Sequence, residues 1–388
     1  MIQNFKDFLT NTDWKQLLAT VEWQELSKQA ALYAEEGIDK LKQTVQETLD
    51  KFSDVQVVVY RGYGSNKVVY LKGRVLKSKK VTLPTEQDST LLNMLNMYKR
   101  IESDEIPEAV LEIRFQGENT MLISDHEGYF DIELTPNNPL QVLPHTETFE
   151  VRLQNSPVGQ VSEPIIEQGK IFVPPAQAEF GIISDIDDTI IETSATDVLK
   201  MLQNTFTKNA LTRVPFDGVR SFYRALQQGS TGDNHNPIFY VSSSPWNLYD
   251  FLLHLIDVHD LPEGVFCLRD YGIDKNKMAV SAHGEHKINE ITKILNTYPH
   301  LPFILIGDSG QQDAPSYRKI AELFPDRILA IYIRDIKNPE RLMFVNDVYK
   351  DFYGSKTQVL VMQETIEAAR HAVMNGWIQP QALQNFEE

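Results

Sequence analysis

Two aspartates spaced two residues apart, Asp185 and Asp187, follow a short apolar run. The run from Phe180 to Ser184 is too short for a helix and is typical of a buried parallel strand. Carboxylates at the carboxyl end of such a strand lie where open α/β sheets have their binding and catalytic sites. Two close carboxylates repel each other unless a cation or a phosphoryl group uses them. The pair therefore predicts metal-assisted phosphoryl transfer.

Three further segments place polar side chains where a predicted strand ends or a predicted helix begins. They supply Ser242 after the strand 238–241, Lys287 at the start of a helix, and Asp308 and Asp313 after the strand 303–306. Because parallel strands end at the same edge of a sheet, we expect these groups to meet around Asp185. Ser243 or Ser244 could take the place of Ser242. Asp313 is as suitable for a helix cap as for a metal ligand.

The elements that must position these groups follow from the pattern of the second half of the chain. Between about 176 and 388, short apolar runs alternate with segments of helical periodicity. That rhythm predicts an α/β domain with a doubly wound, mainly parallel sheet. Only about 190–213 separates the first aspartates from the next predicted element, so we expect a small cap over the site. A helix at 363–374 is expected near the C-terminus.

The first half of the chain has a different pattern. Residues 54–175 contain short β-type runs separated by turn residues, which predict a β-sandwich domain. One inserted helix is predicted to start at Asp88 or Ser89. Residues 1–53 contain no proline and predict an N-terminal helical segment packed on the body of the protein. A membrane-surface or partner helix is the alternative for that segment.

The composition narrows the class of protein and its partners. The 388 residues predict two or three domains, and a hydrophobic content of 42% is enough for their cores. The net charge of −17 argues against non-specific binding to nucleic acid or to anionic bilayers, although it leaves room for a local basic pocket. The single cysteine, Cys267, excludes an internal disulfide and a cysteine-rich zinc site. We recognise no signal peptide and no apolar run of membrane length, so we expect a cytoplasmic protein, or one peripheral to a membrane.

The four chemical motifs resemble those of the haloacid dehalogenase superfamily, whose phosphatases use an aspartate as nucleophile. The resemblance covers about 180–336, and the motifs occur in the order of that superfamily. A closer resemblance includes both halves of the chain and rests on the segments 60–64, 92–100, 240–246, 307–311 and 331–334. These are similar to the actin-patch-protein family, Mg²⁺-dependent phosphatidate phosphatases with fungal members and many bacterial relatives. The resemblance, not the residues themselves, implies phosphatidate as substrate.

Within this resemblance, the residues take roles that elementary chemistry supports. Asp185 is expected to attack phosphorus and form an aspartyl phosphate. Asp187 is expected to protonate the leaving oxygen and then to activate water. Ser242 would donate a hydrogen bond to a phosphoryl oxygen, while Lys287 offsets charge at the nucleophile and the phosphate. Thr189 is expected to fix the loop that holds Asp187.

A divalent cation is expected between the nucleophile and the phosphate, because it would reduce their repulsion. Mg²⁺ prefers oxygen ligands. The expected ligands are the carboxylates of Asp185 and Asp308 and the backbone carbonyl of Asp187. Asp313 is expected to bind the ion through water or to orient Asp308.

Other functions stay open at this point. The chain could be a phosphatase of a sugar phosphate or of a phosphoprotein instead of a lipid. It could also be a binding or scaffold protein whose phosphatase domain is vestigial, with a partner of the sandwich domain that the sequence does not identify. Arg334 is expected to be structural, bonding carbonyls at the end of the sheet.

Overall fold

The computed structural model describes residues 55–77, 105–142, 146–158, 164–191, 215–270, 281–352 and 356–386. Three predicted elements lie outside these residues. They are the N-terminal helical segment 1–53, the inserted helix that starts at Asp88 or Ser89, and nearly all of the cap expected at 190–213.

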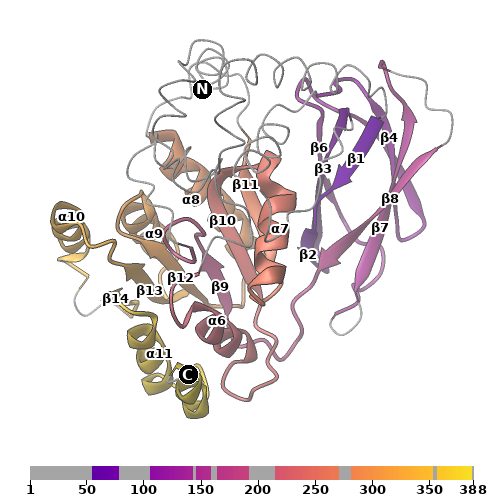
Figure 1. The fold of residues 1–388 in the computed structure, drawn as a ribbon. Coiled ribbons are helices and arrows are strands. Elements are labelled where there is room, and N and C mark those ends of the chain that lie inside the picture. The colour runs from indigo at the N-terminus through magenta and orange to yellow at the C-terminus, as the bar shows by residue number, and fades with distance from the viewer. Residues whose placement is uncertain are drawn as a thin grey trace, which may run out of the picture.

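The first part of the described chain is rich in strands, as predicted, and we call residues 55–172 the β unit (Figure 1). Its strands are β1 (Val55–Val59), β2 (Gly62–Ser65), β3 (Val68–Lys77), β4 (Val110–Phe115), β5 (Glu118–Ile123), β6 (Tyr129–Leu134), β7 (Glu147–Asn155) and β8 (Ile165–Phe172). All neighbouring pairs are antiparallel except β2 and β8.

The eight strands of the β unit are hydrogen-bonded into one sheet with the order β1-β3-β2-β8-β7-β4-β5, and β6 pairs with β3. The short strand β2 joins the two halves, because Tyr63 pairs with Tyr70 of β3 and with Phe172 of β8. Alternate residues form the core, among them Leu111 and Ile113 of β4, as the period of two in a strand requires. The division into the two layers of a sandwich stays a prediction.

The second part, residues 180–386, is the α/β unit, and it confirms the predicted α/β class. Six parallel strands form its sheet in the order β11-β10-β9-β12-β13-β14. They are β9 (Gly181–Ser184), β10 (Ile238–Pro245), β11 (Val265–Arg269), β12 (Phe303–Asp308), β13 (Ile328–Arg334) and β14 (Gln358–Met362).

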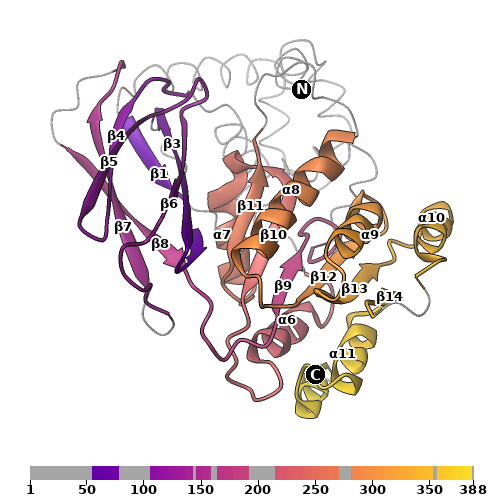
Figure 2. The same cartoon turned by 180° about the vertical axis from the view of Figure 1, so that it is seen from behind.

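Helices pack on both faces of this sheet (Figures 1 and 2). One face carries α6 (Val219–Gln228), α7 (Tyr249–Val258) and α11 (Thr365–Met374), and the other carries α8 (Ser281–Thr297), α9 (Asp313–Leu323) and α10 (Pro339–Tyr349). Its described residues also form two short 3-10 helices, η2 (Trp246–Leu248) and η3 (Pro380–Phe386). Because both faces are covered, the central strands are apolar throughout, so Ile304 and Ile306 point to one core and Phe303 and Leu305 to the other.

The strand order creates a topological switch point at β9. From β9 the chain adds β10 and β11 on one side, and then crosses to add β12 and β13 on the other. In open α/β sheets the crevice at such a point, outside the carboxyl ends of the strands, is where ligands bind. Close packing of β9 on β12 requires a glycine, because a Cβ at Gly181 would collide with the ring of Phe303. The carboxyl ends of β9, β10 and β12 are therefore brought together.

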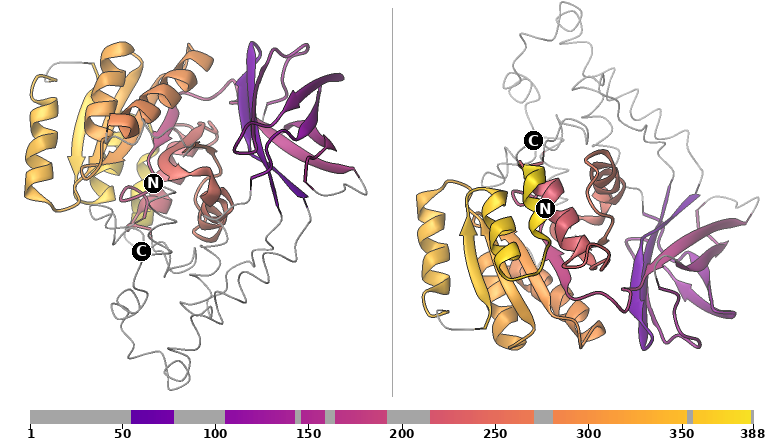
Figure 3. Two further views of the ribbon diagram at one scale, coloured as in Figure 1. Left: turned by 90° about the horizontal axis from the view of Figure 1, so that it is seen from above. Right: turned by 90° about the horizontal axis from the view of Figure 1, so that it is seen from below.

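The β unit lies beside the α/β unit, at the end of the parallel sheet where β11 is the edge strand (Figure 3). Tyr60 and Tyr129 of the β unit belong to the same apolar cluster as α6 and α7. Within the described ranges, no helix is both long and apolar enough to cross a membrane.

Candidate active site

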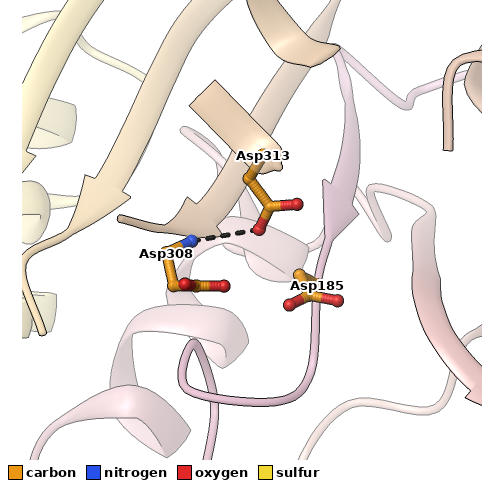
Figure 4. A group of neighbouring side chains, drawn as sticks. All are labelled: Asp185, Asp308 and Asp313. Carbon is orange, nitrogen blue, oxygen red and sulfur yellow. Dashed lines mark hydrogen bonds between the residues drawn. The ribbon is translucent and has the colours of Figure 1, made fainter. Parts of the chain in front are cut away.

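Three buried carboxylates meet at the switch point. Asp185 follows β9, Asp308 is the last residue of β12, and Asp313 is the first residue of α9. Their side chains are buried, and one carboxylate oxygen of each lies within 4.8 Å of the other two. Figure 4 shows the three side chains directed toward a common space between the ends of β9 and β12.

The backbone around Asp308 fixes two of these carboxylates. The Asp308 amide donates to Asp313 Oδ2 over 3.1 Å, and Asp308 Oδ1 accepts from the amides of Gly310 and Gln311 over 2.6 and 2.9 Å. A Cβ at Gly307 would collide with the Asp313 carboxylate. The glycine therefore allows Asp313 to approach the strand end, and the hydrogen bonds hold Asp308 in one orientation.

Lys287 of α8 lies within this acidic group, as the sequence predicts. Its Nζ lies 3.0 Å from Asp185 Oδ1 and also pairs with Asp313 Oδ1, and the lysine side chain is 2% exposed. Burial acts to lower the pKa of Lys287, but the charges of Asp185, Asp313 and Asp308 outweigh burial and raise this pKa well above its usual value. Lys287 is therefore cationic, and it offsets part of the negative charge of the site.

The charges and the unpaired oxygens of this group suit a hard divalent cation. Three carboxylates face the single ammonium of Lys287, so the four side chains together carry excess negative charge when all are ionised. Asp185 Oδ2 and Asp308 Oδ2 accept no hydrogen bond from the residues that the structure describes, and Asp185 Oδ1 faces only Lys287 Nζ. Buried carboxylate oxygens without donors are costly unless a cation binds them. Oxygen donors of this kind fit Mg²⁺.

Burial raises the pKa values of two of the three carboxylates, Asp185 and Asp308. Burial raises the pKa of Asp185 to about 8, with Lys287 opposing the rise and the charge of Asp313 adding to it. Burial likewise raises the pKa of Asp308 well above its usual value, and the neighbouring charges of Asp313 and Asp185 raise it further. A bound cation would favour the ionised forms that these surroundings disfavour.

This acidity predicts how stability depends on pH and on Mg²⁺. Asp185 has a pKa of about 8 in the folded protein and 3.8 as a free group. Between these two pKa values the folded chain keeps a proton on Asp185 that the unfolded chain has lost. The stabilisation from Asp185 is therefore complete below pH 3.8 and is lost as the pH rises toward about 8. We expect the melting temperature in EDTA to fall between about pH 5 and pH 8, and Mg²⁺ to raise it more at the alkaline end.

Thermal unfolding followed with and without Mg²⁺ across that range would check this expectation. In Asp185→Asn the slope in EDTA should be shallower than in the unsubstituted protein. An identical slope in both proteins would show that another group causes the loss of stability.

Asp187 differs from the other acidic residues because it is partly exposed. Its Oδ2 accepts a hydrogen bond from Ser244 Oγ over 2.9 Å. Its backbone carbonyl, the predicted metal ligand, lies 3.5 Å from the side-chain Nε2 of Gln311. The Asp187 carboxylate thus lies beside the group of three, where a substrate could reach it from solvent.

The loop after Asp185 is held by backbone contacts and by Arg334. Asp188 adopts a left-handed conformation, with φ at 57°, and its amide donates to the Ile191 carbonyl over 2.8 Å. Arg334 Nε donates to the Thr189 carbonyl over 3.1 Å, which agrees with the structural role expected for this arginine. Thr189 itself is buried, and its Oγ1 has no hydrogen-bond partner among the described residues.

The three serines after the apolar part of β10 take different positions. Ser242 is buried, and its Oγ accepts a hydrogen bond from the Ser244 amide over 3.0 Å. Ser244, not Ser242, bonds the Asp187 carboxylate. The sequence names Ser244 as an alternative to Ser242 but does not predict this contact. The contacts of Gly307 and Gln311 at the site were also not predicted, since a glycine and an amide give no signal of their own.

The fold and the site define an α/β protein in which three buried carboxylates that could hold a metal ion meet at a switch point. Residues 180–335 match the family model of the catalytic domain of phosphatidate phosphatase APP1. This segment contains all the residues of the candidate site, and it is similar to the catalytic domain of that family. This match confirms the resemblance stated from the motifs that lie within 180–335.

Two fungal proteins are similar in sequence to part of this chain. Phosphatidate phosphatase APP1 of Saccharomyces cerevisiae is 38% identical over 159 residues, which is 41% of this chain and 26% of the yeast protein. An uncharacterised protein of Schizosaccharomyces pombe is 26% identical over 220 residues, 54% of this chain and 33% of that protein. These matches therefore cover about a quarter to a third of the length of each relative.

Solved structures give a weaker likeness. A carbohydrate acetylesterase from Xanthomonas citri covers 79% of this chain and 66% of its own chain, with 12% sequence identity and a TM-score of 0.26. That score is too low to indicate a common fold.

Proposed function

We propose that this protein is a Mg²⁺-dependent phosphomonoesterase that acts through an aspartyl phosphate, with phosphatidate as substrate and diacylglycerol and phosphate as products. The single observation that supports it most is the placement of Asp185. This carboxylate is buried beside Asp308, its Oδ1 lies 3.0 Å from Lys287 Nζ, and its Oδ2 accepts no hydrogen bond from a described residue. A carboxylate so placed is available both to a cation and to an electrophile.

The bonding changes follow from the positions of the two acids. An oxygen of Asp185 attacks phosphorus, the bond to the ester oxygen breaks, and Asp187 gives that oxygen its proton. Asp187 then takes a proton from water, which attacks phosphorus, releases phosphate and restores Asp185. Ser242 donates a hydrogen bond to a phosphoryl oxygen, and Lys287 offsets its charge. Thr189 holds the loop that carries Asp187 through its backbone carbonyl, which accepts from Arg334 Nε.

The carboxylates of Asp185 and Asp308, with the backbone carbonyl of Asp187, would hold Mg²⁺, and Asp313 would orient Asp308 or bind the ion through water. The ion supplies charge neutralisation between the carboxylates and the phosphate. The hydrogen bond from the Asp308 amide to Asp313 Oδ2 supports the orienting role.

We also propose a division of the chain into domains and a cellular location. The α/β unit corresponds to a haloacid dehalogenase-like catalytic domain at 176–388, with a small cap at about 190–213. A β-sandwich domain at 54–175 and a helical segment at 1–53 precede it. The single cysteine suits a cytoplasmic enzyme, and a lipid substrate would require peripheral contact with a membrane.

Replacing Asp187 with asparagine tests the assignment of the proton donor. Without the donor, an ester whose leaving oxygen needs a proton should lose about 10²-fold in rate. An ester whose leaving group departs as a stable anion, such as 4-nitrophenyl phosphate, should lose much less of its rate. Initial rates on phenyl phosphate and 4-nitrophenyl phosphate measure this difference, and an equal loss on both would reject Asp187 as the donor.

The substrate is tested by direct competition. Purified protein with Mg²⁺ should release phosphate from phosphatidate in mixed micelles at a higher kcat/KM than from sugar phosphates or a phosphopeptide. A preference for a soluble phosphoester would identify another phosphatase activity. No hydrolysis of any of these compounds would indicate a binding or scaffold protein.

A further inference from the structure

The segment that carries the three serines is only weakly held by its own sheet. Strand β10 pairs with β9 only from Ile238 to Tyr240. Against β11, the register shifts between Val241 and Pro245. The residues Ser242–Ser244 therefore bulge out of the ladder, as extra residues in one strand do. Their position must be fixed by other contacts.

The β unit supplies such contacts directly after the serines. The ring of Tyr60 stacks on Trp246 with centroids 4.2 Å apart, and it meets Tyr249 edge-on at 4.7 Å. Arg74 Nη1 donates to Asn247 Oδ1 over 3.1 Å. Tyr60 and Arg74 are each 3% exposed, and Trp246 is 8% exposed. This contact between the two units is therefore buried.

Arg74 is itself held rigidly within the β unit. Its Nε donates to the Glu127 carbonyl over 2.8 Å, its Nη2 donates to Glu105 over 3.2 Å, and its guanidinium lies 4.2 Å from the centre of the Tyr129 ring. Three of its contacts are thus internal to the β unit, and the contact with Asn247 reaches the α/β unit. A guanidinium with several fixed partners loses little further freedom when it bonds one more.

A short covalent path connects this contact to the candidate active site. Asn247 lies three residues after Ser244, and Ser244 Oγ donates to the Asp187 carboxylate over 2.9 Å. The Ser244 amide also donates to Ser242 Oγ. A shift of Asn247 would therefore move both the serine expected to contact phosphate and the partner of the expected proton donor.

We propose that the β unit is part of the catalytic apparatus, with Arg74 acting through Asn247 as a positioning pair for Ser242, Ser244 and Asp187. The inference rests on the proposed phosphatase function for its kinetic meaning. It assigns the β unit a role in proton donation, beyond that of a substrate-binding or tethering module.

The test substitutes Asn247, because changes at Arg74 would also disrupt the interior of the β unit. Asn247→Leu removes the acceptor, whereas Asn247→Asp keeps an oxygen for Arg74. Arg61→Gln is the matched control. It removes two other contacts between the units, with the Gly264 carbonyl at 3.1 Å and Glu263 at 2.7 Å, which lie away from the serines in sequence.

We expect Asn247→Leu to lose about tenfold in kcat on phenyl phosphate and less than about twofold on 4-nitrophenyl phosphate, since misplacing the donor affects the poorer leaving group. Asn247→Asp should restore most of this rate, and Arg61→Gln should leave the ratio of the two rates unchanged. An unchanged ratio in Asn247→Leu, or an equal shift in Arg61→Gln, would overturn the inference.

Hydrogen–deuterium exchange separates this inference from the proposed function. In Asn247→Leu, amides of residues 242–247 should exchange faster than in Arg61→Gln, whatever reaction the protein catalyses. If the unsubstituted protein hydrolyses no phosphoester, the proposed function fails, and unchanged exchange in Asn247→Leu would overturn the positioning role separately.

Discussion

Asp185→Asn should abolish turnover, with a loss on the order of 10³-fold or more in kcat, because an amide cannot serve as the nucleophile. Asparagine has nearly the same size and shape as aspartate, and burial raises the pKa of the Asp185 carboxyl to about 8. Removing that charge from a buried site should leave the protein folded and at least as stable in the absence of metal. Phosphate release from phosphatidate and thermal unfolding would be measured on the same preparation.

The matched control for this substitution is Asp188→Asn. Asp188 is also buried, three residues farther along the chain, and its left-handed conformation is one that asparagine tolerates. It bonds the Ile191 carbonyl through its backbone, which the substitution keeps. We expect turnover of Asp188→Asn to stay within about tenfold of the unsubstituted protein, since no bond is made or broken at this residue.

The identity of the nucleophile can be tested independently of rate. Acid quenching during turnover should trap a phosphoryl group on Asp185, and peptide mass spectrometry would locate it. Full activity in Asp185→Asn, or a phosphoryl group on another residue, would reject the assignment.

Much of the α/β unit could be predicted because its signals are local. The runs at 181–184 and 303–308 are apolar and short, which indicates buried parallel strands, and the polar residue at each end marks the functional edge. Lys287 and Asp308 were expected beside Asp185, and the structure brings them there. Their agreement follows from a general property of parallel sheets, whose strands all end on one side.

The remaining features depend on contacts between residues far apart in the sequence. Tyr60 belongs to a motif in the β unit, but nothing local indicates that its ring stacks on Trp246. The choice of Ser244 as the partner of Asp187 depends on a register shift that periodicity does not reveal. Gly307 is needed only because Asp313 approaches it from the next helix. Distant pairings of this kind determine how the site is held.

Removing the divalent cation should silence the enzyme as completely as removing the nucleophile. The buried Oδ2 atoms of Asp185 and Asp308 accept no hydrogen bond from described residues. Without a cation, the ionised carboxylates repel the incoming phosphate. Burial raises the pKa of Asp185 and of Asp308, and the protonated form of Asp185 that this favours cannot attack phosphorus. We expect dialysis against EDTA to abolish phosphate release and added Mg²⁺ to restore it.

A substitution at Asp308 tests whether the Mg²⁺ requirement comes from the three buried carboxylates. Asp308→Asn keeps the size of the side chain and an oxygen that can accept from Gly310 and Gln311, but it removes one charge from the cation site. The Mg²⁺ concentration for half-maximal activity should rise about 10- to 100-fold. Asp335→Asn, at a buried aspartate that follows β13 and bonds the Lys337 amide, should leave it unchanged. Full activity in EDTA, or an equal shift in both variants, would show that these carboxylates hold no catalytic metal ion.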